Sequence, residues 1–275
     1  MIPFAELAAT SVPPADRRET YGSDALQFGE LRMPAKSGKH PVIVLIHGGC
    51  WRSAYTLAHV GPAAAALARA GYVVWVPEYR RVGDAGGGWP GTFEDIAAAV
   101  DYVRTLATRF SAIDSSRVIL VGHSAGGQLA LWAASRSRRG TAAGLDVPSR
   151  PPLAVSGVVS LAGITDMAAY GAATGGCNSA VAALMDGTPA DMPQRYRAVN
   201  PIDRLPLGVP VYLVHGAADP IVPVALSEQY ATRARAAGDR VEISRVERAG
   251  HFDVVAPQAT AWAAVVAAIH AIAAP

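Results

Sequence analysis

Residues 117–137 read RVILVGHSAGGQLALWAASRS, and this stretch decides the fold. The apolar run over residues 117–121 predicts a buried strand, and the run from residue 125 to about 137 predicts a helix. Between them, Gly122-His123-Ser124-Ala125-Gly126 fits the pattern G-x-S-x-G. Small residues on both sides of the serine allow a sharp turn from strand to helix, which leaves the Ser124 hydroxyl at the helix N-terminus.

Outward from this stretch, strand-like and helix-like runs alternate, which is typical of a mostly parallel sheet with helices on both faces. We predict further strands at 41–47, 72–76, 155–161, 209–215 and 241–246, and an early antiparallel strand at 26–33. We predict helices at 56–70, 92–109, 224–237 and 257–273, where Thr92 followed by Asp95 looks like a capping box. Residues 163–206 have no clean period, so we expect short helices there that form a small cap. The length fits one domain over residues 1–275.

Composition argues against several classes of protein. The net charge is only +2 and 17% of residues are charged, so neither a nucleic-acid partner nor a disordered chain is indicated. The Ala-rich stretch 259–275 is short for a bilayer span and contains His270, and residues 1–20 lack a signal-peptide pattern. Cys50 and Cys177 are too few for a disulfide framework. We therefore expect no membrane partner and a cytoplasmic location; the sequence does not indicate an oligomeric state.

The segment His47-Gly48-Gly49-Cys50-Trp51 follows the strand predicted at 41–47. Glycines allow a backbone to approach a substrate closely, and acyl transfer needs N–H donors aimed at a developing oxyanion. We expect these donors to be the N–H groups of Gly49, Cys50 and Ala125, with His47 holding the loop. We assign Trp51 to substrate binding, as a wall of the acyl pocket, and packing in the core is its alternative role.

An acid and a base can be assigned from their positions after the last two strands. In a G-x-S-x-G hydrolase the triad follows the chain order Ser, acid, His. Asp219 comes just after the strand at 209–215, and His251 follows the strand at 241–246. His251 would take the proton of Ser124 and return it to the leaving group, while Asp219 orients the ring. The other acids considered are Asp166, Asp186 and Asp203.

No metal or cofactor is expected from the sequence. The seven histidines show no H-E-x-x-H or similar ligand spacing. Residues 86–91 fit G-x-G-x-x-G, but they do not directly follow a strand and they include Pro90. We interpret them as a rim loop rather than as a dinucleotide site.

The motifs HGGCW, GHSAGG, HGAADPIVP and AGHFD together resemble those of the α/β-hydrolase superfamily over almost the whole chain. Within it they resemble the kynurenine formamidase (arylformamidase)-like carboxylesterases, as does PEYRR at 77–81. The resemblance implies an α/β-hydrolase fold and a triad of Ser124, Asp219 and His251, with Gly49, Cys50 and Ala125 as oxyanion donors.

The activity that this resemblance implies is hydrolysis of small carboxylic esters through an acyl-enzyme. The alternatives are an aryl-formamide hydrolase, an acyltransferase and a non-catalytic binding protein. The partner would be a small-molecule ester or amide, and we expect the cap over 163–206 to select it.

Overall fold

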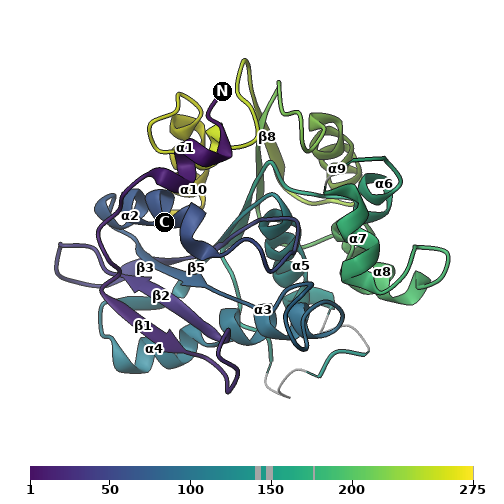
Figure 1. Ribbon diagram of the computed structural model, residues 1–275. Coiled ribbons are helices and arrows are strands. Elements are labelled where there is room, and N and C mark those ends of the chain that lie inside the picture. Colours follow the sequence, from purple (N-terminus) through teal and green to yellow (C-terminus); the bar gives the residue numbers. More distant parts are fainter. Residues whose placement is uncertain (140–143, 147–150, 176, 275) are drawn as a thin grey trace.

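The computed structural model describes residues 1–139, 144–146, 151–175 and 177–274 (Figure 1). Within these residues, eight strands form one sheet in the order β1-β2-β4-β3-β5-β6-β7-β8. The strands are β1 (Arg17–Thr20), β2 (Phe28–Arg32), β3 (His40–Ile46), β4 (Val73–Pro77), β5 (Ile113–His123), β6 (Gly157–Leu161), β7 (Val211–Gly216) and β8 (Val241–Val246). β1 and β2 pair antiparallel at one edge, and the neighbours from β4 to β8 are parallel. The α/β-hydrolase fold predicted from the sequence is confirmed.

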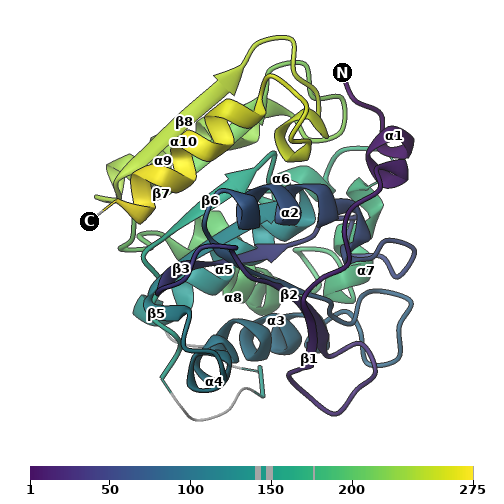
Figure 2. The same ribbon diagram turned by 90° about the vertical axis from the view of Figure 1, so that its left-hand side faces the viewer.

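The sheet is covered by helices on both faces because the side chains of its central strands alternate between two cores. Val42, Val44 and Ile46 of β3 belong to one core, whereas Ile43 and Leu45 belong to the other. The helices are α1 (Phe4–Ala9), α2 (Gly61–Arg69), α3 (Gly91–Asp101), α4 (Val103–Arg109), α5 (Ala125–Arg139), α9 (Val224–Ala236) and α10 (Trp262–Ala273). Helices α3, α4, α5 and α9 contribute to the first core, and α1, α2 and α10 to the second (Figure 2).

The segment 163–206 lies beside α5 and α9 (Figure 1). Its described residues form α6 (Met167–Gly171), α7 (Asn178–Met185), α8 (Pro193–Val199) and the 3₁₀ helix η2 (Pro201–Arg204); residue 176 lies outside the described part. Val181, Leu184 and Met185 of α7 are buried in the first core. The segment therefore packs directly on the domain instead of projecting away from it.

Two sequence predictions about local structure were incomplete or wrong. The sequence analysis did not predict β1 or α1. The single helix predicted at 92–109 is divided into α3 and α4 at Tyr102, and Thr92 is not its N-cap, because α3 begins at Gly91. Instead, the Thr92 hydroxyl donates to the Arg80 carbonyl at 2.6 Å, and the Asp95 carboxylate pairs with the Arg80 guanidinium. Both side chains are thus used to join α3 to the segment after β4.

Trp51 lies in the core. Its side chain is fully buried, and the indole Nε1 donates to Oε1 of Gln128 on α5 at 3.1 Å. Gln128 in turn donates to the Val199 carbonyl at the end of α8. Trp51 therefore joins the loop after β3 to α5, and through Gln128 to the cap segment, which favours the packing role.

Replacing Trp51 by Ala should lower the free energy of unfolding by about 3–5 kcal/mol, because it leaves a cavity and an unpaired Gln128 amide oxygen. Denaturant titration measures this loss. Trp262, which is only partly buried at the start of α10, provides the control, and Trp262→Ala should cost less. A Trp51→Ala variant of normal stability with an altered preference for acyl-chain length would instead assign Trp51 to a pocket wall.

Candidate active site

Ser124 occupies the sharp turn between β5 and α5. Its φ is 57°, in the left-handed region that residues other than glycine seldom adopt. Gly126, two residues later, lies so close to the Ile46 and His47 carbonyls at the end of β3 that a Cβ atom there would collide with them. The first peptide N–H groups of a helix lack a partner within it and attract negative charge. In α5 the Gly127 N–H already donates to the Ser124 carbonyl, which leaves the N–H groups before it as candidates. The turn therefore presents the Ser124 hydroxyl beside a set of N–H donors, of which Ala125 supplies one.

His251 and Asp219 are brought together from the loops after β8 and β7. Nδ1 of His251 lies 2.7 Å from Oδ2 of Asp219, and the Asp219 carboxylate is fully buried. Because the carboxylate accepts this hydrogen bond, Nδ1 carries the proton and Nε2 remains available to Ser124. Ser124 and His251 line the same cavity.

Several donors hold the Asp219 carboxylate in its charged form. Oδ1 accepts from the peptide N–H groups of Ile221 and Val222 at 2.8 and 2.9 Å, and His215 lies 3.3 Å from Oδ2. Burial by itself raises the pKa of Asp219, but the hydrogen bonds from His215 and His251 outweigh it and hold that pKa well below its usual value. Asp219 is therefore an anion near neutral pH, as an acid that orients a histidine must be.

Two histidines that sequence reasoning left without a function lie beside the triad residues. Nε2 of His123 donates to the His251 carbonyl at 3.0 Å, which holds the histidine loop against the turn at Ser124. The pKa of His123 lies well below its usual value, mainly because the ring is buried and to a smaller extent because His251 is next to it. Burial also lowers the pKa of His59 to about 3. Both rings are therefore uncharged near neutral pH.

The loop after β3 lies against the turn at Ser124. A Cβ on Gly48 would come within 2.6 Å of the His123 carbonyl oxygen and 2.9 Å of the Ser124 Cβ, so only a glycine allows this approach. Gly49 and Cys50 then line the cavity together with Ser124. The assignment of their peptide N–H groups as oxyanion donors stays a prediction.

A buried ionic cluster holds this loop in place. Nε2 of His47 lies 2.8 Å from Oε1 of Glu78, and Arg81 pairs with the same oxygen at 2.8 Å. The second oxygen of Glu78 accepts the Leu57 N–H at 3.0 Å. Burial raises the pKa of Glu78, but the hydrogen bond from His47 and the charge of Arg81 bring it below its usual value. His47 thus has the structural role expected of it, and the PEYRR segment supplies its partners.

The cavity at the site has a volume of about 250 Å³. It is lined by Phe4, Gly49, Cys50, Tyr55, His59, His123, Ser124, Cys177, Ile221, His251 and Phe252. Four of the aromatic rings form a contiguous cluster around Phe4 of α1. The centroid of the Phe4 ring lies 5.5 Å from that of Tyr55, 6.0 Å from that of His59 and 5.5 Å from that of Phe252. No sequence motif pointed to Phe4, Tyr55 or Cys177, because only the folded chain places them near Ser124.

The assignment of Trp51 to substrate binding needs correction. Trp51 is absent from the residues that line the cavity, and its indole points into the core. The alternative acids also lie elsewhere: Asp166 caps α6, Asp186 pairs with Arg195 at the surface, and Asp203 accepts from Asn200. Among the described carboxylates, Asp219 is the one hydrogen-bonded to His251.

Cys50 and Cys177 form a disulfide across 127 residues of sequence, which the sequence analysis did not predict. Only the tertiary structure brings the loop after β3 to the start of α7, so spacing gave no sign of this pair. The Cys50 thiol is therefore not free.

The described residues include neither a membrane-spanning helix nor a cluster of metal-ligating side chains. No helix among them is long and apolar enough to cross a membrane. They also contain no group of three or more His, Cys, Asp or Glu side chains placed to hold a metal ion. Residues 86–91, which resemble a dinucleotide motif, lead into α3, and Trp89 donates its N–H to the Leu184 carbonyl of α7.

Comparisons with known proteins place the chain in a family. The model of the BD-FAE family matches residues 30–233. Esterase LipC of Mycobacterium tuberculosis is 25% identical over 248 residues, which cover 87% of this chain and 60% of LipC, so the chain spans well under the full length of this relative.

Solved structures show the same fold. A truncated carbohydrate esterase from gut microbiota superposes with a TM-score of 0.81 at 22% identity, covering 95% of this chain and 99% of the other. Propionate-bound esterase Est2 of the planctomycete Thermogutta terrifontis superposes with a TM-score of 0.73 at 22% identity, covering 95% of this chain and 97% of Est2. The BD-FAE match extends over most of the chain, including Ser124 and Asp219, and the chain therefore belongs to the BD-FAE family.

Proposed function

We propose that this chain hydrolyses esters of small carboxylic acids through an acyl-enzyme on Ser124. The observation that carries the proposal is the shared cavity of Ser124 and His251, with Asp219 held 2.7 Å from the histidine. Nε2 of His251 takes the hydroxyl proton as Ser124 Oγ attacks the ester carbonyl, and then returns it to the departing alcohol. Water repeats the same steps to release the acid.

The charge that develops on the carbonyl oxygen needs donors that are already in place. Gly49 and Cys50 line the cavity and Ala125 is the first residue of α5, so their peptide N–H groups are the candidate donors. Such preorganised donors stabilise the oxyanion without further rearrangement, and the loss of one typically costs about 10²–10³-fold in kcat. We assign these three groups to the oxyanion hole.

The size and lining of the cavity support small substrates. A volume of about 250 Å³ lies just below the range of roughly 300–1,000 Å³ for pockets that hold drug-sized ligands. The rings of Phe4, Tyr55 and Phe252 close one side. Est2, which has the same fold, was crystallised with propionate, a three-carbon acid. We therefore propose short acyl chains, from acetyl to butyryl.

A second candidate is the hydrolysis of aryl-formamides. The aromatic cluster around Phe4 favours it, because flat aryl groups stack on such rings. A panel of p-nitrophenyl esters and N-formylkynurenine separates the two substrates. Adding an alcohol or amine to the same assay detects acyl transfer, and labelling by a fluorophosphonate distinguishes an active serine from a non-catalytic binder.

Replacing Ser124 by Ala should lower ester turnover by roughly 10⁶-fold, as the removal of a triad serine does, while the protein remains folded. Turnover of p-nitrophenyl acetate measures the loss, and circular dichroism checks the fold. A fluorophosphonate should label the wild type at Ser124 and leave the variant unlabelled. Near-normal turnover in the variant would remove Ser124 from the mechanism.

Replacing Asp219 by Asn should lower kcat on the order of 10⁴-fold, because an amide no longer enforces the Nδ1–H tautomer of His251. Asp186→Asn is the matched control, since the Asp186 side chain is 80% exposed and pairs with Arg195 at the surface. Asp166→Asn and Asp203→Asn should likewise cost far less. If any of these three proves more damaging than Asp219→Asn, the acid has been misassigned.

Replacing Phe4 by Ala should raise kcat/KM for longer acyl chains relative to acetyl. Each additional methylene that finds room should lower the activation free energy by about 1–3 kcal/mol. The reason is that Phe4 contacts the rings on the cavity wall without belonging to the triad. A series from acetyl to octanoyl esters measures the shift. Glu6→Ala on the exposed side of α1 is the control and should leave the profile unchanged. Wild-type protein that prefers octanoyl to acetyl esters would refute the small-acyl proposal.

A further inference from the structure

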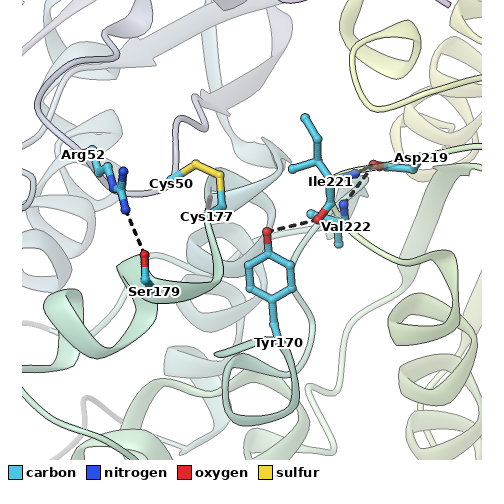
Figure 3. Close-up of a disulfide and its surroundings, with 8 residues drawn as sticks. All are labelled: Cys50, Arg52, Tyr170, Cys177, Ser179, Asp219, Ile221 and Val222. Atoms are coloured by element: carbon cyan, nitrogen blue, oxygen red, sulfur yellow. Dashed lines mark hydrogen bonds between the residues drawn. A yellow bond between two sulfur atoms is a disulfide. The ribbon is translucent and has the colours of Figure 1, made fainter. Parts of the chain in front are cut away.

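The Cys50–Cys177 disulfide joins the loop that carries the oxyanion donors to the start of α7 in the cap segment (Figure 3). The two Cα atoms lie 5.3 Å apart. Close by, Nη2 of Arg52 donates to the Ser179 hydroxyl of α7 at 3.2 Å. The same two segments are therefore connected by a covalent bond and by a hydrogen bond at the surface.

The cap segment is also connected to the loop that carries the acid. The Tyr170 hydroxyl of α6 donates to the Ile221 carbonyl at 3.1 Å, and the Ile221 N–H donates to Asp219 (Figure 3). The cap thus contacts both sides of the cavity, and the disulfide is its covalent link to the oxyanion side.

The oxyanion loop has a backbone that needs external support. Gly49, Cys50 and Trp51 follow one another with φ values of 106°, 54° and 53°, all in the left-handed region. For Cys50 and Trp51 this conformation costs free energy and persists only where the surroundings hold it. The indole of Trp51 is held by Gln128, whereas the side chain of Cys50 is held by its bond to Cys177. Breaking that bond removes a constraint from Cys50, one of the residues that line the cavity.

Both cysteines also line the cavity that contains Ser124 and His251, and both are half-buried. A small thiol that enters the cavity can therefore reach the disulfide. The oxidation state of this pair and the geometry of the site are consequently coupled.

We infer that the Cys50–Cys177 disulfide is a positioning element for the reaction, and that turnover depends on its oxidised state. When intact, it holds the N–H groups of Gly49 and Cys50 where the oxyanion forms; when reduced, the loop relaxes and the donors move. The inference rests on the proposed function, because it concerns the oxyanion hole of that reaction.

Reduction by a dithiol is a balanced exchange. One thiolate of the reagent attacks a sulfur of the protein disulfide, and its second thiolate then closes a cyclic disulfide. Two electrons and two protons pass from the reagent to the sulfur atoms of Cys50 and Cys177, which become thiols. Re-oxidation by oxidised glutathione reverses the change through the same type of exchange.

The test compares oxidised, reduced and re-oxidised wild-type protein with p-nitrophenyl acetate. The dithiol is removed by gel filtration under argon before the assay, because thiols attack the ester directly, and the assay is run below the melting temperature of the reduced form. We expect kcat to fall by about 10- to 10²-fold on reduction, as misplaced catalytic groups cause, with KM within about twofold. Re-oxidation should restore kcat.

Variants separate positioning from simple support of the fold. Cys177→Ser should show the lowered kcat with no response to dithiol. Ser179→Ala, which removes the neighbouring hydrogen bond between the same segments, should retain the wild-type kcat and its redox response. If the disulfide only stabilised the fold, its loss would lower the melting temperature and leave kcat unchanged.

The inference is overturned if reduced protein, with two thiols labelled by iodoacetamide, turns over ester as fast as the oxidised form. It is also overturned if KM alone rises, or if both cysteines label before reduction. Failure of the proposed function gives a different result, in which no form hydrolyses any ester of the panel and Ser124 is not labelled by the fluorophosphonate.

Discussion

The close approach of two backbone segments, the end of β3 and the turn between β5 and α5, underlies the whole site. Gly126 lies against the Ile46 and His47 carbonyls, and Gly48 lies against the His123 carbonyl. Because β3 and β5 are neighbouring parallel strands, their carboxyl ends meet at one edge of the sheet. Side chains larger than hydrogen at these positions would separate the nucleophile from the oxyanion loop. The parallel pairing of β3 with β5 and the glycines together set the distance between the nucleophile and the oxyanion loop.

Buried histidines and carboxylates then fix the loops around this contact. Glu78 holds His47 and so the oxyanion loop, His215 supports Asp219, and His123 holds the main chain of His251. Glu78 and Arg81 form a buried ion pair; such pairs contribute little net stability, but losing one partner leaves an uncompensated charge, so the pair favours a single arrangement. His123 connects the nucleophile turn directly to the base.

Segments distant in sequence close the cavity on its remaining sides. Helix α1 contributes Phe4, and the start of α7 contributes Cys177. Neither belongs to the central sheet, so the rim of the site can vary while the triad stays in place. The chemistry is thus determined by the strand ends, and the shape of the cavity by the segments that pack over them. This division is consistent with a fold that carries many substrate preferences.

Apart from β1 and α1, the sequence alone determined the order of the strands and of the main helices. It also determined the turn at Ser124, and Asp219 and His251 as residues that follow strands. These features depend on local spacing: apolar runs define strands, and a parallel sheet gathers the residues after its strands at one edge. Thr92 was misassigned as an N-cap because its hydroxyl donates to the Arg80 carbonyl instead, and the helix predicted at 92–109 is divided at Tyr102. Only the tertiary structure decided that Trp51 packs in the core, that Phe4 lines the cavity and that Cys50 pairs with Cys177, because these contacts join residues far apart in the chain and leave no periodic signal in the sequence.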